Sequence, residues 1–210
     1  DPRVSQSLPM HFAAAINGAA VARGTSFLSD KMGKLVTAKG LSIIDDPLRP
    51  RGLRSKGFDG EGVPTQKRSL VEDGILLSWL LDLRSARQLG FKTTGNATRG
   101  ISSPPSPSAT NLYLEAGNIS PKELINDVSQ GFYVTEMMGQ GINMVTGDYS
   151  RGASGFWIEK GEITEPVSEL TIAGNLTDMF MQMSPANDLV YRYGINAPTV
   201  RIDGMTVAGK

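Results

Sequence analysis

The sequence predicts an α+β fold, with mainly antiparallel β-sheets and a few short helices packed on them. Segments with strand character outnumber segments with helix character, and several strands follow one another through short turns, as in hairpins. The helix signals are short and carry recognisable caps. The chain has 210 residues and no detectable repeat, so we expect one domain, residues 1–210, with a core of its own.

Composition excludes several classes of protein. Hydrophobic residues make up 40% of the chain and charged residues 20%, and no apolar run approaches the ~20 residues of a membrane span. Lys and Arg together number 21, as do Asp and Glu, so no global positive field would attract nucleic acid. We therefore expect neither a nucleic-acid partner nor a membrane.

Cysteine is absent and histidine occurs once, as His11. The absence of cysteine removes disulfides and thiolate nucleophiles, and it fits a reducing compartment. A catalytic zinc ion normally takes three protein ligands, so a site in this chain would be at least two-thirds carboxylate, which suits zinc poorly. Any Ser-His-Asp or Cys-His mechanism would likewise depend on His11.

The first expected helix covers residues 8–22, LPMHFAAAINGAAVA, with Asn17 and Gly18 as an interruption. Alanine favours helix and lets neighbouring elements come close, so we expect this helix to be packed against. A strand is expected at 41–45, where β-branched residues alternate, and Pro47 follows its end.

The next segments alternate between loop and turn signals. Residues 50–66 are rich in Gly, Arg and Pro and predict an ordered loop. Asp73 and Gly74 lie between two apolar segments and predict a hairpin, because both turn residues can take positive φ. A short helix is expected at 83–89, ended by Gly90.

Prolines and a helix cap organise the middle of the chain. Residues 93–110 are mostly Thr, Gly, Ser and Pro, and their prolines predict a surface loop without regular pairing. A strand is expected at 111–115. Ser120 and Glu123 form a capping box that begins a helix at 121–130.

The last third of the chain is expected to be mostly β-structure. Its segments alternate in hydrophobicity, and glycine-containing turns separate them. The expected strands are 132–136, 142–149 paired with 153–159, 167–173, 189–192, 199–202 and 205–208.

A short helix interrupts these strands after Asn175, which is expected to be its N-cap with Asp178 in its first turn. The large apolar residues of this helix indicate burial or an interface. They are Met179, Phe180, Met181 and Met183.

The glycine-rich stretch 135–163 is the strongest candidate for a site. Exposed strand edges and amide side chains can bind an extended peptide main chain by strand addition. In an extended segment, Asp148 and Ser150 would face one way while Tyr149 and Arg151 face the other, which weakens any reading of them as one catalytic unit. A glycine-punctuated hairpin and a buried polar tie within the sheet remain open as alternatives.

Several blocks of the sequence resemble the C-terminal region of the TldD/PmbA family, formerly described as modulators of DNA gyrase. The block at 146–163 together with ELTIAGNL is most similar to the PmbA branch, also called TldE. The matching blocks are RGTSFLSDKMGK at 23–34, FDGEGVPT at 58–65, EDGILLSWLLDLRSARQLG at 72–90, TEMMGQG at 135–141, TGDYSRGASGFWIEKGEI at 146–163 and EPVSELTIAGNLTDMF at 165–180.

The resemblance implies a two-subunit, cytoplasmic, zinc-dependent peptidase that trims unstructured peptides, and an N-terminal domain before Asp1. In the TldD branch a helix carries a His-Glu-x-x-x-His pattern, and a cysteine downstream supplies a further ligand. Here Phe12 and Ile16 stand where the Glu and second His would be, and the cysteine is missing. No metal ligand is therefore assigned to this chain.

The leading hypothesis is a metal-free subunit that pairs with a zinc-bearing TldD-like chain, or with itself, around an unstructured peptide. One alternative is a self-contained hydrolase that uses carboxylates such as Asp59, Glu61 or Asp148, and another is a scaffold without substrate contact. The residues expected to contact peptide or partner are Gly139, Gln140, Gly141, Asn143, Asp148, Tyr149, Arg151, Met179, Phe180 and Met183.

Overall fold

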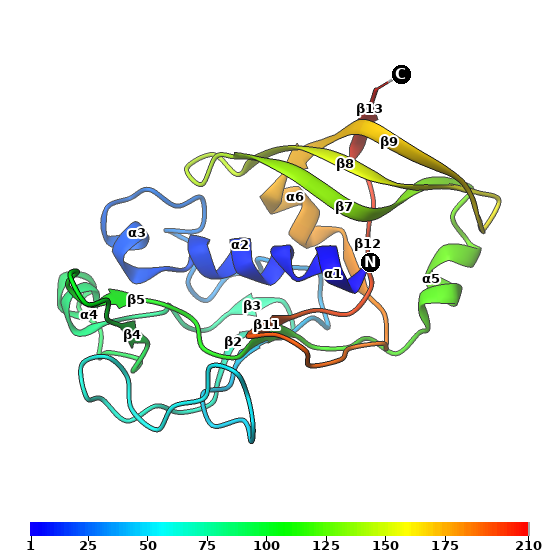
Figure 1. Ribbon diagram of the computed structural model, residues 1–210. Helices are drawn as coiled ribbons and strands as arrows, with labels where there is room; N and C mark the ends of the chain where they lie inside the picture. The colour runs from blue at the N-terminus through cyan, green and yellow to red at the C-terminus, as the bar shows by residue number, and fades with distance from the viewer. Residues whose placement is uncertain (210) are drawn as a thin grey trace.

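Helix α2, Ser7–Ala15, lies between the two main β-sheets (Figure 1). The structure is a computed structural model and describes residues 1–209. Phe12, Ala15 and Ile16 have no exposed surface, because the helix is covered from both sides. Below it the helix contacts strands β6 and β11, and above it His11 meets the Tyr149 ring of β8. The predicted packing of this small-residue helix is confirmed.

The sheet below α2 has five short strands in the order β11-β6-β1-β2-β3. All neighbours are antiparallel except β11 and β6, which are parallel. The strands are β1 Ile43–Asp45, β2 Arg68–Glu72, β3 Ile75–Leu76, β6 Leu112–Leu114 and β11 Ile195–Asn196.

The sheet above α2 has four strands in the order β13-β9-β8-β7, all antiparallel. Three of them are long and form a twisted meander, and β7 and β13 are its edges (Figure 1). The strands are β7 Gln130–Ile142, β8 Asp148–Glu159, β9 Glu162–Asn175 and β13 Thr206–Ala208. Together the two sheets confirm the α+β class with mainly antiparallel pairing.

Short helices and two small ladders complete the fold. Among residues 1–209, no helix has the length and apolar character needed to cross a membrane. The helices are α1 Pro2–Ser5, α3 Gly18–Ala22, α4 Leu83–Leu89, α5 Pro121–Asn126 and α6 Leu176–Met181, and the ladders pair β4 Ala97–Thr98 with β5 Ser106–Pro107 and β10 Met183–Pro185 with β12 Val200–Ile202.

The predicted helix caps and the predicted turn at Asp73 are confirmed at the expected residues. The expected interruption at Asn17 and Gly18 separates α2 from α3. Asn175 caps α6 through its side chain, and Ser120 with Glu123 forms the reciprocal capping box of α5. Asp73 and Gly74 both have positive φ, 48° and 80°, in the turn between β2 and β3. These interactions span only a few residues, which is why the sequence reveals them.

Two expectations fail around the prolines and the glycines. Pro107 pairs with Ala97 in a two-residue ladder, although we expected no pairing in 93–110; a proline is tolerated in so short an outer pair. The predicted pair 142–149 with 153–159 is also wrong, because β7 and β8 pair instead and the turn between them lies at 143–147.

Three further differences concern the bounds of helices and strands. Helix α5 ends at Asn126 rather than at 130, since β7 already begins at Gln130. Met183 lies in β10 and not in the helix with Met179. No strand forms at 189–192, and β11 begins a few residues later, at Ile195.

Glycines in the β7–β8 pair allow the strands to come unusually close. A Cβ at Gly155 would overlap the Tyr133 carbonyl oxygen, and one at Gly141 would overlap the Ser150 carbonyl oxygen. Both positions border a register shift in the ladder. At these bulges the partner backbone occupies the space of a side chain.

Gly155→Ala should therefore lower the free energy of unfolding by about 1–3 kcal/mol, because the strands must separate to admit the methyl group. Gly152→Ala in the same strand is the matched control, since its nearest neighbour would be 3.5 Å away. Urea unfolding of both variants checks this. Equal stability of the two would contradict the close-approach explanation.

Candidate functional site

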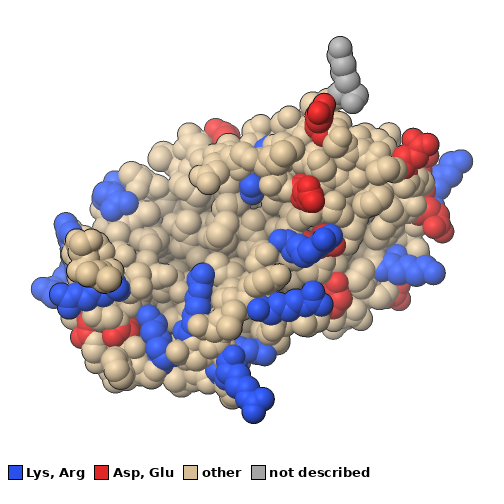
Figure 2. Space-filling model, viewed as in Figure 1, with Lys and Arg blue, Asp and Glu red and all other residues tan. Residues whose placement is uncertain are grey.

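A cleft of about 610 Å³ opens where strand β7 faces helices α1 and α2. Figure 2 shows the hollow on this face of the molecule, with Lys and Arg side chains spread along its lower rim. The cleft is lined by Arg3, Val4, Gln6, Ser7 and Met10 from the helices, Thr135, Glu136, Met137, Met138 and Arg151 from the upper sheet, and Arg54, Tyr193, Gly194 and Ile195 from below.

One wall of the cleft is the free edge of β7. This strand pairs with β8 on one side only, and no other strand in residues 1–209 pairs with its outer edge. Helix α1 covers the start of that edge, where the Asp1 ammonium group donates to the Val134 carbonyl at 3.2 Å. Open edge therefore remains from Thr135 onward, and it borders the cleft.

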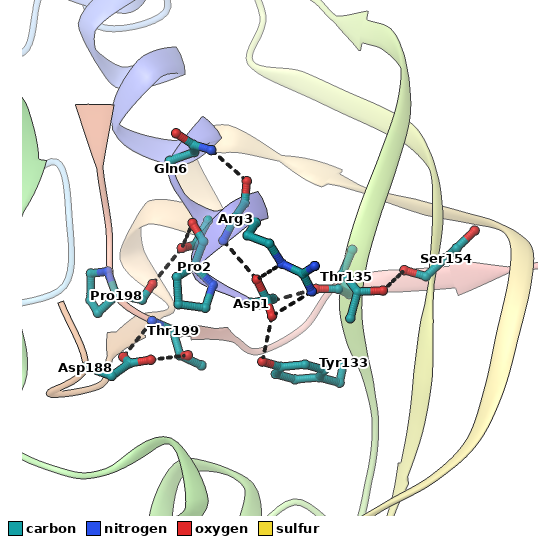
Figure 3. Close-up of polar contacts among 12 residues, drawn as sticks. Asp1, Pro2, Arg3, Gln6, Tyr133, Thr135, Ser154, Asp188, Pro198 and Thr199 are labelled. Atoms are coloured by element: carbon teal, nitrogen blue, oxygen red, sulfur yellow. Dashed lines mark hydrogen bonds and ion pairs between the residues drawn. The ribbon is translucent and has the colours of Figure 1, made fainter. Parts of the chain in front are cut away.

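Helix α1 is held in this position by several polar contacts (Figure 3). The Tyr133 hydroxyl donates to the Asp1 carboxylate at 3.3 Å, and Arg3 Nε donates to the same carboxylate at 2.8 Å. On the other side, Ser5 Oγ donates to the Pro198 carbonyl at 2.6 Å. The bonds of Asp1 and Ser5 join α1 to β7 and to the segment before β12, respectively.

The opposite wall comes from the turn before β11. Asn196 Oδ1 accepts hydrogen bonds from the main chains of Arg192 and Tyr193, each at 2.9 Å. The Arg54 side chain lies directly over Gly194, where a Cβ would collide with it. The sequence analysis missed this wall, because it joins a loop and a turn that are far apart in the chain.

Beneath the cleft lies a cluster of polar side chains with few partners. Ser7 Oγ, His11 Nε2 and Arg151 Nε are buried and form no hydrogen bond within the described residues. The His11 ring meets the Tyr149 ring edge to face, with centroids 6.2 Å apart. The Tyr149 hydroxyl in turn donates to Met137 Sδ at 3.0 Å.

Burial and the nearby guanidinium control the charge of this cluster. Desolvation, helped by the positive charge of Arg151, lowers the pKa of His11 to about 4. Burial also raises the pKa of Tyr149, against the opposing effect of Arg151. At neutral pH both His11 and Tyr149 are therefore uncharged, and Arg151 carries the only charge of the three.

The residues around His11 do not fit a zinc ion. Within residues 1–209, no group of three or more His, Cys, Asp or Glu side chains is placed to hold a metal. The nearest charged neighbour of His11 is cationic, and it would repel a second cation. No catalytic step through a metal can be derived from this chain's own residues.

A second cavity of about 500 Å³ lies on the inner face of the upper sheet. Its walls are mainly apolar and include Leu8, Phe132, Trp157, Ile172 and Met179. Val4, Ser7 and Met137 line both cavities, so the two spaces adjoin beneath α1.

The structure brings together only part of the set expected from the sequence. Tyr149 and Arg151 face α2, and Asp148 and Ser150 are exposed on the other face, as the alternation predicted. The remaining expected residues divide between the exposed end of the hairpin, which holds Gly139, Gln140, Gly141, Asn143 and Asp148, and the core, which holds Met179, Phe180 and Met183.

At the hairpin end, the polar side chains stabilise the turn. Asn143 Oδ1 accepts from the main chain of Val145 at 2.9 Å, and Asp148 accepts from Thr146 Oγ1 at 2.6 Å. Phe180 has no exposed surface and packs edge to face against Phe12, so its side chain belongs to the core.

The acidic loop at Asp59 and Glu61 is held by its own backbone. Asp59 accepts main-chain hydrogen bonds from Glu61 and Val63 through one oxygen and from Ala97 through the other. Glu61 accepts from the main chain of Leu83 at 2.7 Å. Both carboxylates anchor the loop.

Comparisons with known proteins agree with this fold. The family model of the PmbA/TldA metallopeptidase C-terminal domain matches residues 1–209. Metalloprotease PmbA of Escherichia coli O157:H7 is 43% identical over 208 residues, covering 99% of this chain and 44% of that protein. A Metalloprotease TldD homolog of Haemophilus influenzae is 32% identical over 202 residues, covering 88% of this chain and 42% of that protein.

Two solved structures are similar as well. The crystal structure of a Bacteroides thetaiotaomicron protein described as a modulator of DNA gyrase matches with a TM-score of 0.88 and 30% identity, covering 100% of this chain and 46% of that one. The structure of TldE from Thermococcus kodakarensis matches with a TM-score of 0.85 and 26% identity, covering 96% and 48%. The chain thus spans less than half the length of these relatives.

His11 should stay neutral down to about pH 4, which NMR titration of its imidazole can follow, with assignment by loss of the signal in His11→Gln. Because the folded pKa lies below the unfolded value of 6.5, the unfolded chain binds the proton first as pH falls. The free energy of unfolding should therefore fall between pH 6.5 and 4, by about 3 kcal/mol in all.

Arg151→Met should raise the pKa of His11 while leaving it below the ordinary value, since desolvation remains. Arg84→Met, on exposed α4, is the control and should leave the pKa unchanged. An unshifted His11 in Arg151→Met would show that the two side chains do not interact.

Proposed function

Because the chain belongs to the PmbA/TldD metallopeptidase family, through the C-terminal domain of that family, we propose that it is a metal-free subunit of a peptidase complex. In this proposal a metal-bearing TldD-like subunit supplies the zinc ion, and the complex acts on unstructured peptides in the cytoplasm. The observation that carries the proposal is the open edge of β7 beside a cleft, beneath which His11 has no co-ligands among residues 1–209.

The free edge of β7 supports binding of an extended peptide by strand addition. An unpaired edge presents a row of main-chain donors and acceptors, which recognise a peptide backbone without regard to its side chains. The cleft follows this edge at 135–138 and is closed on its other side by Tyr193 and Ile195. A single extended segment would lie between these walls, as an unstructured substrate requires.

The polar cluster under the cleft supports the division of labour between two subunits. In place of ligands, His11 has the Tyr149 ring and the Arg151 guanidinium beside it. A helix at this position can therefore shape the peptide site without binding the metal. The relatives include proteins named TldD and TldE, which is consistent with a family of two kinds of chain.

The alternative of a carboxylate hydrolase has less support. Asp59 and Glu61 are occupied by main-chain donors, and Asp148 is bonded within its turn. A scaffold without substrate contact remains the second candidate. The second cavity favours it, because a space of about 500 Å³ with mainly apolar walls could receive part of another protein. The experiments below separate it from the first.

We expect the full-length protein to bind no stoichiometric zinc and to cleave no peptide alone, and to become part of an active enzyme when mixed with a TldD-like chain. Metal analysis and a peptide-cleavage assay, each with and without the partner, measure this. Zinc-dependent cleavage by the protein alone would refute the proposed role.

Strand addition can be tested on the peptide, leaving the protein unchanged. N-methylation at alternate residues removes the main-chain donors of one peptide edge, and two or three lost hydrogen bonds of about 1 kcal/mol each should weaken binding at least tenfold. Methylation at the intervening residues, whose donors face away from β7, is the matched control. If both methylation patterns leave affinity unchanged, the scaffold alternative is favoured.

A further inference from the structure

The cleft at the edge of β7 has an excess of positive charge. Its charged lining residues are Arg3, Arg54, Arg151 and Glu136. Arg3 is already paired with Asp1, whereas neither Arg54 nor Arg151 forms an ion pair within 4 Å among the described residues. Two guanidinium groups without an ion pair in the described residues therefore share one concave space with a single carboxylate, in a chain whose formal net charge is zero.

The two arginines reach the cleft from different elements. Arg151 projects from β8 on the side of the sheet that faces α2, and its Nε is buried without a hydrogen-bond partner among residues 1–209. Arg54 comes from the loop after β1 and lies over Gly194, where the absence of a side chain leaves room for it. Arg151 is half-buried at the floor of the cleft, whereas Arg54 is exposed at its rim.

Ser7 provides an independent observation that a ligand belongs here. Ser7 lines the cleft and is 8% exposed, and its Oγ has no hydrogen-bond partner in the part of the chain that the structure describes. Leaving a buried hydroxyl and a buried guanidinium N–H without acceptors costs about 1–3 kcal/mol for each group. An acceptor from outside the chain would satisfy both.

We propose that this cleft binds a carboxylate group of its peptide ligand, with Arg151 and Ser7 donating to it from the floor and Arg54 from the rim. The inference rests on the proposed function, because it names the chemistry of the substrate at the same site. A carboxylate is the anionic group of an unmodified peptide, and its two oxygens match the paired donors of a guanidinium.

The source of the carboxylate is either the C-terminus of the peptide or an Asp or Glu side chain. Four acetylated peptides of one neutral sequence distinguish them: a C-terminal amide, the free acid, the amide with one Gln replaced by Glu, and the free acid with that Glu. Binding is measured by calorimetry on the full-length protein in complex with its TldD-like partner.

The expected result is that one or both kinds of carboxylate tighten binding about tenfold over the neutral amide. Arg151→Met and Arg54→Met should abolish this gain, so that each variant binds the acidic and the neutral peptides with equal affinity. Arg84→Met removes an exposed arginine on α4 and should preserve the gain. Equal affinity for all four peptides, or an equal loss for neutral and acidic peptides in Arg151→Met, would overturn the inference.

A second readout separates this inference from the peptide proposal. The ¹⁵Nε–¹H resonance of Arg151, assigned by its loss in Arg151→Met, should shift on titration with acetate alone. A shift with acetate but no binding of any peptide would refute strand addition and leave the carboxylate site standing. No shift with acetate and none with the free-acid peptide would refute the site even if peptides bind.

Discussion

The fold depends on helix α2 being enclosed between two sheets. With β6 and β11 on one side and the long meander on the other, this helix has little room for large side chains except where they fill the core, as Phe12 does against Phe180. The same enclosure removes water from His11 and Ser7. The enclosure on two sides therefore has two effects. It limits the size of the side chains on the helix, and by desolvation it lowers the pKa of His11.

The cleft lies beside helix α1, where α2 is no longer covered by both sheets. Helix α1 continues from α2 to the edge of the upper sheet and is bonded to Val134 and Tyr133 on one side and to Pro198 on the other. Beyond this junction the two layers separate, so the cleft is the space that the helices cannot fill. Its chemistry is set by three arginines among its lining residues, together with a strand edge that no other strand of residues 1–209 covers.

Sequence reasoning succeeded where the interactions are local. The caps at Asn175 and Ser120 and the turn at Asp73 need only neighbouring residues, and the face alternation of Tyr149 and Arg151 needs only an extended backbone. It failed for the long β7–β8 pair, because the glycines of β8 accommodate a partner backbone rather than a turn, and nothing in their spacing distinguishes the two uses.

The cleft could not be assembled from the sequence for a related reason. Tyr193 reaches it through a parallel pairing of β11 with β6 that has no local signal, and Arg54 comes from the distant loop after β1. Arg151 was identified, but as a member of the hairpin; its neighbours His11 and Ser7 became apparent only once α2 was placed against the sheet.

The open edge of β7 has a further consequence for the chain when it is separated from any partner. Exposed strand edges are where β-proteins join one another and aggregate, and Met138 adds an apolar side chain that is 54% exposed. The bulges on either side of Glu136, the charge of that residue and the positive φ of Gly139 interrupt the flat ladder that such joining requires. The irregular backbone of β7 therefore protects solubility as well as shaping a site, and a substitution that straightens this strand would favour fibres over complexes.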